Sequence, residues 1–156
     1  MRGTRRRKHV EGTLVGDRLR VSFPHWMSLD EAQRTAEELR TRMQRRVAAS
    51  RIDLPARTRA LARRFGLPEP LLVEWSDRQQ HRWGSCTIED RAIRVSARLA
   101  SFPDWVLDYV LVHELAHLLE ASHGPRFREL VDRYPLAERA RGFLIAKDLE
   151  PDGTPT

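Results

Sequence analysis

Two histidines and a glutamate are spaced, within an apolar stretch, so that they can act together. The stretch contains the segment His113-Glu114-Leu115-Ala116-His117. On a helix, residues four apart lie one above the other, so both imidazoles can bind one tetrahedral metal ion. Glu114 follows the first histidine and can accept a proton from a metal-activated water without itself binding the metal. This spacing predicts a helix that carries a zinc hydrolase site.

A third histidine follows at a predicted bend of the chain, which the residue types there indicate. A catalytic zinc site needs a third protein ligand and an open position for water. His123 comes six residues after His117, and the following Gly124-Pro125 pair favours a turn between two helices. We therefore expect His123 to be the third ligand. Two alternatives stay open: Glu120 as the third ligand, or histidines that make only hydrogen bonds in the core.

Several helices and a small sheet must position these groups. Ser28 and Glu31 match a capping box at a helix start, and Gly66 favours a helix end. Gly16 and Asp17 favour a hairpin turn. The expected helices span 28–50, 53–66, 103–121, 125–133 and 135–148. The expected strands span 10–15, 18–23, 71–75 and 93–96, with a turn within 82–87. This order predicts an α+β fold.

The length and composition indicate one globular domain. The chain has 156 residues, and we expect a domain over 10–149 between a basic disordered tail over 1–9 and a polar tail over 150–156. The sequence shows neither a secretory signal nor an apolar run long enough to span a membrane. Cys86 is the one cysteine, so the fold needs no disulfide within the chain. These features predict a cytoplasmic protein without a membrane partner.

The charge balance is basic and depends on arginine. The chain has 28 Lys and Arg against 22 Asp and Glu, for a net charge of +6, and Lys8 and Lys147 are its only lysines. Such a balance is compatible with a nucleic acid or a nucleotide as partner, through a basic surface. The alternative is a solvated basic surface with no specific partner.

Three motifs together resemble a known family. They are Arg82-Trp-Gly-Ser-Cys86, the stretch Leu107 to His117, and His123-Gly-Pro-Arg-Phe127. They resemble the YgjP-like metallopeptidase domain family, over roughly residues 71–149. The resemblance implies a compact zincin-like fold with N-terminal helices, a small sheet and a zinc-binding helix, related to SprT-like peptidases. It also implies one Zn²⁺ per chain on His113, His117 and His123, with Glu114 as general base.

Further residues are candidates to contact a substrate. Arg82, Arg94 and Arg126 can meet an anionic substrate or a developing oxyanion, unless they are solvated surface groups. Tyr134 can also donate to the oxyanion. We expect Cys86 to pack in a turn between strands, shaped by the Trp and Gly of its motif. A fourth zinc ligand at this position is the alternative, and it would close the site.

Three functions follow from these residues. The leading hypothesis is a zinc metallopeptidase that hydrolyses peptide bonds in a peptide or protein substrate. The second is a metal-dependent nucleoside triphosphate pyrophosphohydrolase, an activity with which members of the family have also been labelled. The third is a DNA-associated, SprT-like protease or nucleic-acid-binding module, with phosphate contacts from the basic head over 5–8.

Overall fold

The fold was analysed in a computed structural model, which describes residues 9–78 and 82–148. Residue contacts divide the chain after Val47 into two units. The predicted disordered tails fall almost entirely outside the described residues, which include only His9 of the first tail. The predicted domain boundaries at 10 and 149 stay a prediction.

The first unit consists of a hairpin and most of a long helix. β1 (Glu11–Val15) pairs antiparallel with β2 (Arg18–Ser22), and Gly16 in the turn has a φ of 63°. α1 (Leu29–Ser50) begins with the predicted capping box. The Glu31 amide donates to Ser28 Oγ at 3.2 Å, and the Ser28 amide donates to Glu31 Oε2 at 3.1 Å. The sequence therefore predicted both elements correctly.

The second unit opens with α2 (Leu54–Phe65), whose two ends follow from single residues. Asp53 caps its start, because Oδ1 accepts the Ala56 amide at 3.1 Å. Gly66 ends it in the left-handed conformation, with a φ of 65°. The predicted helix over 53–66 and its end at Gly66 are confirmed.

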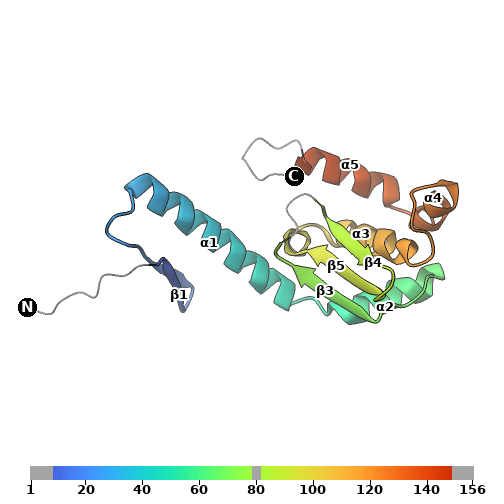
Figure 1. Ribbon diagram of the computed structural model, residues 1–156, viewed down its shortest axis with the longest axis horizontal. Coiled ribbons are helices and arrows are strands. Elements are labelled where there is room, and N and C mark those ends of the chain that lie inside the picture. The colour runs from blue at the N-terminus through green and yellow to red at the C-terminus, as the bar shows by residue number, and fades with distance from the viewer. Residues whose placement is uncertain (1–8, 79–81, 149–156) are drawn as a thin grey trace, which may run out of the picture. The chain divides into compact units, whose positions relative to one another are not determined.

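A three-stranded sheet lies in the middle of the second unit (Figure 1). Its order is β3 (Leu72–Ser76), β5 (Ala92–Ser96) and β4 (Gly84–Thr87). β5 runs parallel to β3 and antiparallel to β4. The prediction of a turn within 82–87 was wrong, since 84–87 form a strand. The turn lies after it, over 88–91, where Arg91 has a φ of 49°.

α3 (Asp104–His117) is the central helix of this unit and packs against α2, β4, β5 and two C-terminal helices. Those helices are α4 (Pro125–Asp132) and α5 (Ala137–Asp148). Apolar residues all round α3 explain its burial, because a helix without a polar face must be covered on every side. Together these elements make the predicted α+β domain. None of the described helices is both long and apolar enough to cross a membrane.

α3 ends four residues before the predicted limit of Ala121. The amides of Leu118 and Leu119 bond to carbonyls only three residues back, at 3.1 and 3.0 Å, which tightens the last turn. His117 then holds the next stretch of chain through the carbonyl of Glu120. The early end of the helix lets the chain turn back toward it.

Candidate metal centre

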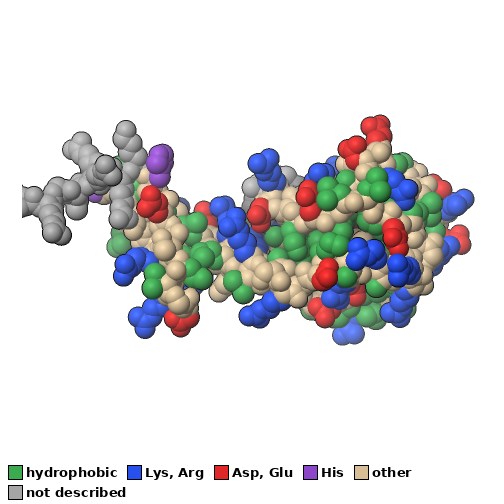
Figure 2. Space-filling model, turned by 90° about the horizontal axis from the view of Figure 1, so that it is seen from below, with side chains coloured by type: hydrophobic (Ala, Val, Ile, Leu, Met, Phe, Trp, Pro, Cys, Tyr) green, Lys and Arg blue, Asp and Glu red, His purple; other side chains and the backbone are tan. Residues whose placement is uncertain are grey.

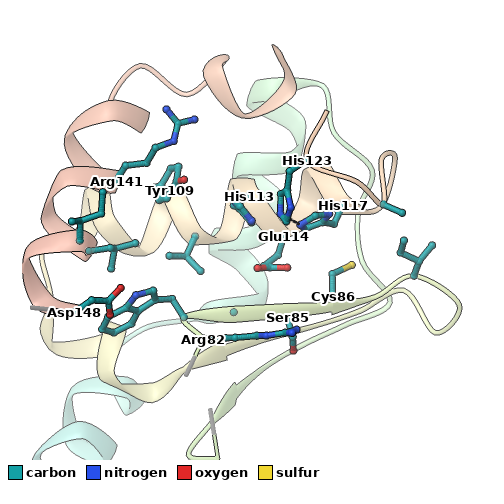
Figure 3. A pocket seen from close by; sticks show the side chains of 17 residues that line it. Arg82, Ser85, Cys86, Tyr109, His113, Glu114, His117, His123, Arg141 and Asp148 are labelled. Carbon is teal, nitrogen blue, oxygen red and sulfur yellow. Dashed lines mark hydrogen bonds between the residues drawn. The ribbon is translucent and has the colours of Figure 1, made fainter. Parts of the chain in front are cut away.

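Three imidazoles converge next to the C-terminal half of α3 (Figure 3). His113 and His117 come from the helix, and His123 comes from the turn before α4. One ligand atom from each lies within 4.8 Å of the other two, and the Nε2 atoms of His117 and His123 are 3.1 Å apart. Two nitrogens bound to one tetrahedral zinc ion at its usual bond length are about 3.4 Å apart. The spacing of the three side chains therefore fits one metal ion.

The ring of His117 is oriented by the backbone. Its Nδ1 lies 2.9 Å from the carbonyl oxygen of Glu120, and this contact requires Nδ1–H as donor. The other ring nitrogen, Nε2, then carries a lone pair and faces His123. The Glu120 side chain instead pairs with Arg126 at 3.2 Å. Glu120 is absent from the cluster of metal-binding groups among the described residues, so the geometry favours His123 over Glu120 as third ligand.

The environment keeps two of these histidines neutral. Burial lowers the pKa of His113 to about 4, and the positive charges of His117, His123 and Arg141 act in the same direction. Burial also lowers the pKa of His117, against the hydrogen bond to Glu120. A neutral imidazole has the free lone pair that a metal ion needs, so the site is ready to bind one at neutral pH.

Glu114 lies buried beside the imidazoles, with 5% of its surface exposed. Burial raises the pKa of its carboxyl to about 7, although the nearby charge of Arg82 lowers it. β4 approaches so closely here that a Cβ on Gly84 would lie 2.9 Å from Glu114 Oε1 and 3.0 Å from Val110 Cγ1. Only a glycine fits between this strand and the carboxyl without displacing them. A carboxyl with a pKa near 7 suits both acceptance and donation of a proton.

A cavity of about 670 Å³ opens over the imidazoles and Glu114 (Figure 3). α3 forms one wall and β4 forms another. One face of α5 completes it with Arg141, Leu144, Ile145 and Asp148, which are spaced three or four residues apart. The walls are largely apolar, with polar groups both at the imidazoles and farther away, at Arg141 and Asp148 (Figure 3). This is the usual character of a ligand-binding cavity.

Comparison with known proteins assigns the chain to a family. A sequence profile of the YgjP-like metallopeptidase domain matches residues 28–144. The chain belongs to the YgjP-like metallopeptidase family. A comparison with curated protein sequences finds no match.

Two solved structures share the fold of this YgjP-like domain. One is the metallopeptidase zymogen jannalysin of Methanocaldococcus jannaschii, with a TM-score of 0.53 and 19% identity over 62% of this chain and 97% of that one. The other is the metallopeptidase zymogen abylysin of Pyrococcus abyssi, with a TM-score of 0.53 and 17% identity over 65% of this chain and 97% of that one. At this identity the likeness concerns the fold, and it confirms the predicted fold class.

Of the four substrate-contacting candidates, the structure brings only Arg82 to the cavity of the YgjP-like domain. Arg94 pairs with Glu74 at 2.7 Å, across β5 and β3. Arg126 forms the ion pair with Glu120. The hydroxyl of Tyr134 donates to the Trp105 carbonyl at 2.8 Å. These three side chains do not line the cavity.

Cys86 lines the cavity from β4, beside the motif histidines (Figure 3). Burial and, to a smaller extent, the charge of Glu114 raise the pKa of its thiol to about 11. A thiol with this pKa stays protonated at neutral pH, whereas a metal ligand must be a thiolate. The described groups that cluster for a metal are the three histidines without Cys86, which favours an open site over a closed one.

Sequence reasoning did not single out several residues of the cavity, among them Tyr109 and Arg141. Tyr109 carried a usable signal, because it precedes His113 by four residues and so shares its face of α3. Arg141 carried none, since only the packing of α5 against α3 brings it to the site.

Proposed function

We propose that this chain hydrolyses peptide bonds in a peptide or protein substrate, with one Zn²⁺ held by His113, His117 and His123. The observation that carries the proposal is the convergence of three ligand nitrogens within 4.8 Å beside a buried carboxyl. Membership of a metallopeptidase family supports the reaction class. Three nitrogen ligands suit zinc, whereas magnesium prefers an octahedron of oxygens.

The residues around the ion divide the reaction among them. A zinc ion in this position supplies a Lewis acid, which activates water and polarises the carbonyl of the scissile bond. Glu114 accepts the proton that the attacking water loses, and then donates it to the leaving amine. Its buried position beside the three imidazoles lets the same carboxyl do both. Gly84 leaves the space in which this carboxyl sits.

The same cavity gives weaker support to nucleotide hydrolysis. Nucleotide hydrolysis usually depends on Mg²⁺, which prefers hard oxygen ligands. Three histidines provide softer nitrogen ligands and suit this ion poorly. On the face drawn in Figure 2, basic and acidic side chains are interspersed, as on an ordinary solvated surface. The basic head over 5–8, which the nucleic-acid hypothesis needs, lies outside the described residues.

The test is the metal content of the purified protein, with wild type, His123→Ala and His25→Ala compared. His25 is an exposed histidine before α1 and serves as the matched control. We expect about one zinc per chain in wild type and in His25→Ala, and little in His123→Ala after dialysis. Cleavage of fluorescein-labelled casein should follow the zinc content, stop with a chelator and return when zinc is added back.

Two results would overturn the proposal. Zinc that binds equally well without His123 would remove the ligand assignment. Wild-type protein that is loaded with zinc but leaves casein and a random peptide library intact would remove the peptidase assignment. Release of pyrophosphate from a nucleoside triphosphate, lost in Glu114→Gln, would then favour the nucleotide reaction.

We also propose a cytoplasmic location. Support comes from Cys86. A chain with one cysteine forms no internal disulfide, so its fold does not depend on an oxidising compartment. Fractionation of the source cells, with detection by an antibody, tests this. Recovery of the protein outside the cytoplasmic fraction would contradict it.

A further inference from the structure

The chain has two tyrosines, and the structure gives them different surroundings. The hydroxyl of Tyr134 is committed, because it donates to the Trp105 carbonyl at 2.8 Å. Tyr109 instead lines the cavity over the imidazoles. A tyrosine hydroxyl at a hydrolytic site is a hydrogen-bond donor that does not need to lose its proton. Tyr109 is therefore the tyrosine whose side chain can contact a substrate in the cavity.

Tyr109 lies next to His113, one of the three proposed metal ligands. It precedes His113 by one helical turn, and the two ring centroids are 6.0 Å apart. A second, smaller hollow of about 510 Å³ adjoins the cavity on the α4 side. Four residues line both hollows: Tyr109, His113, His123 and Arg141. Tyr109 thus borders both hollows, as do His113 and His123, two of the proposed metal ligands.

Arg141 of α5 contacts the Tyr109 side chain and positions its phenol. Its guanidinium pairs with Asp132 at 3.1 Å and also with Glu138, so it is held on two sides. Its central carbon lies 5.8 Å from the Tyr109 ring centroid. Burial lowers the pKa of Arg141, but hydrogen bonding to Asp132 and to the Tyr109 phenol outweighs it and raises the pKa.

Contact with Arg141 determines whether the Tyr109 hydroxyl acts there as hydrogen-bond donor or acceptor. A guanidinium has only N–H groups, so in a contact with Arg141 the phenol oxygen must accept. The O–H of Tyr109 then remains to be donated elsewhere. Tyr109 is 7% exposed, and the open space beside it is the cavity. Arg82 also lines the cavity, but its charge acts on the Glu114 carboxyl and not on Tyr109. Glu114 lies on the other side of His113 from Tyr109 in Figure 3.

We propose that Tyr109 is a catalytic residue that donates its O–H to the carbonyl oxygen of the scissile bond, and that Arg141 is its positioning residue. This inference rests on the proposed peptidase function. As water attacks the carbonyl carbon, the π electrons move onto the carbonyl oxygen while Glu114 takes the water proton. The Tyr109 hydrogen bond strengthens with that negative charge, and no proton leaves the phenol.

The test is Tyr109→Phe, which removes the hydroxyl and keeps the ring. The probe is an internally quenched peptide that spans a casein bond cleaved by the wild-type protein. Loss of a single oxyanion donor costs about 100-fold or more in kcat. We expect kcat to fall by about that factor while KM changes less than threefold, with full zinc content. A phosphinic peptide that mimics the tetrahedral state should bind more weakly by a similar factor.

Tyr134→Phe is the matched control, since it removes the other hydroxyl of the chain. It should lower the melting temperature through the lost bond to Trp105, and leave kcat of the folded protein within about twofold. Arg141→Met should lower kcat in the presence of Tyr109, and add nothing to Tyr109→Phe. This lack of additivity separates a positioning role from a general loss of stability.

The outcomes separate the inference from the function on which it rests. Wild-type protein without peptidase activity would end the proposed function itself. Active, zinc-loaded wild type with an unchanged kcat in Tyr109→Phe would overturn only the role of Tyr109. A change in KM alone, or loss of zinc in Tyr109→Phe, would also overturn it. Effects of Arg141→Met that add fully to those of Tyr109→Phe would overturn the positioning role.

Discussion

α3 and α5 both line the cavity, and they differ sharply in burial. Nine of the 14 residues of α3 are buried, against three of the 12 residues of α5. A residue packed on all sides can be held in one position, while a half-exposed wall can change without disturbing the core. The cavity therefore has a fixed side, α3, which carries His113, His117 and the Glu114 carboxyl, and an adaptable side, α5, which shapes the space for a substrate.

The largest effect should come from the carboxyl on the fixed side. Glu114→Gln keeps the shape of the side chain but removes its ability to take a proton. We expect casein cleavage to fall by about 1000-fold, within the usual range for a lost general base, with zinc content unchanged. Glu129→Gln, an exposed glutamate of α4, is the control and should keep full activity. Residual activity above one tenth of wild type would count against the base assignment.

A core substitution on α3 should cost stability before it costs chemistry. Leu111 is fully buried, at 0% exposed, and belongs to the main hydrophobic cluster. Leu111→Ala leaves a cavity in that cluster, so we expect the free energy of unfolding to fall by about 3 kcal/mol. Urea unfolding followed by circular dichroism measures this. A loss below about 1 kcal/mol would mean that α3 is less rigidly packed than its burial indicates.

The buried carboxyl should also make the stability of the metal-free protein depend on pH. Burial raises the pKa of Glu114 to about 7, above its ordinary 4.5, although Arg82 opposes this. As pH rises from 4.5 to 7, the unfolded state loses this proton first. Stability from this group is therefore full below pH 4.5 and is lost by about pH 7, a difference of about 3 kcal/mol.

The variant Glu114→Gln isolates the contribution of this carboxyl to the pH dependence of stability. His113 acts in the opposite direction, since its lowered pKa reduces stability as pH falls, but both proteins share it. After dialysis against a chelator, the stability of Glu114→Gln relative to wild type should rise between pH 5 and pH 7. A constant difference over this range would show that the carboxyl titrates at its ordinary pKa.

The smallest effect on stability should come from the adaptable side. Ile145 of α5 lines the cavity and is 59% exposed. Ile145→Ala should change the free energy of unfolding by less than about 0.5 kcal/mol. Because an apolar wall selects side chains by size, preference between peptides with leucine and alanine beside the cleaved bond should shift by up to about 10-fold. An unchanged preference would place the substrate side chain away from α5.

The positions of the residues on the fixed side could be predicted well from the sequence, because they depend on spacing between residues that are close together in the chain. Helical spacing alone aligned His113 with His117, and the Gly124-Pro125 pair marked the turn that brings His123 back. The capping box at Ser28 and the glycine end at Gly66 depend likewise on a few adjacent residues. Such patterns are legible without knowledge of the tertiary fold.

The adaptable side escaped prediction, because packing between distant segments decides it. Arg141 reaches the cavity only through the contact of α5 with α3. Tyr134 lies away from the cavity, because its hydroxyl donates to the carbonyl of Trp105, which comes from another part of the chain. β4 was missed as a strand because Gly84-Ser-Cys-Thr87 is short and starts with a glycine. Its pairing with β5 is a tertiary preference that overrides the local one.

The three histidines that we propose as ligands lie in one short stretch of chain, 113–123. Closing so short a loop costs little entropy, so a nascent or unfolded chain can hold an ion through the same imidazoles. An ion that also binds the unfolded chain stabilises the native state by less than its affinity suggests. Zinc should therefore raise the unfolding midpoint only modestly, and an ion can load during synthesis before α5 and its Arg141 are made and complete the cavity.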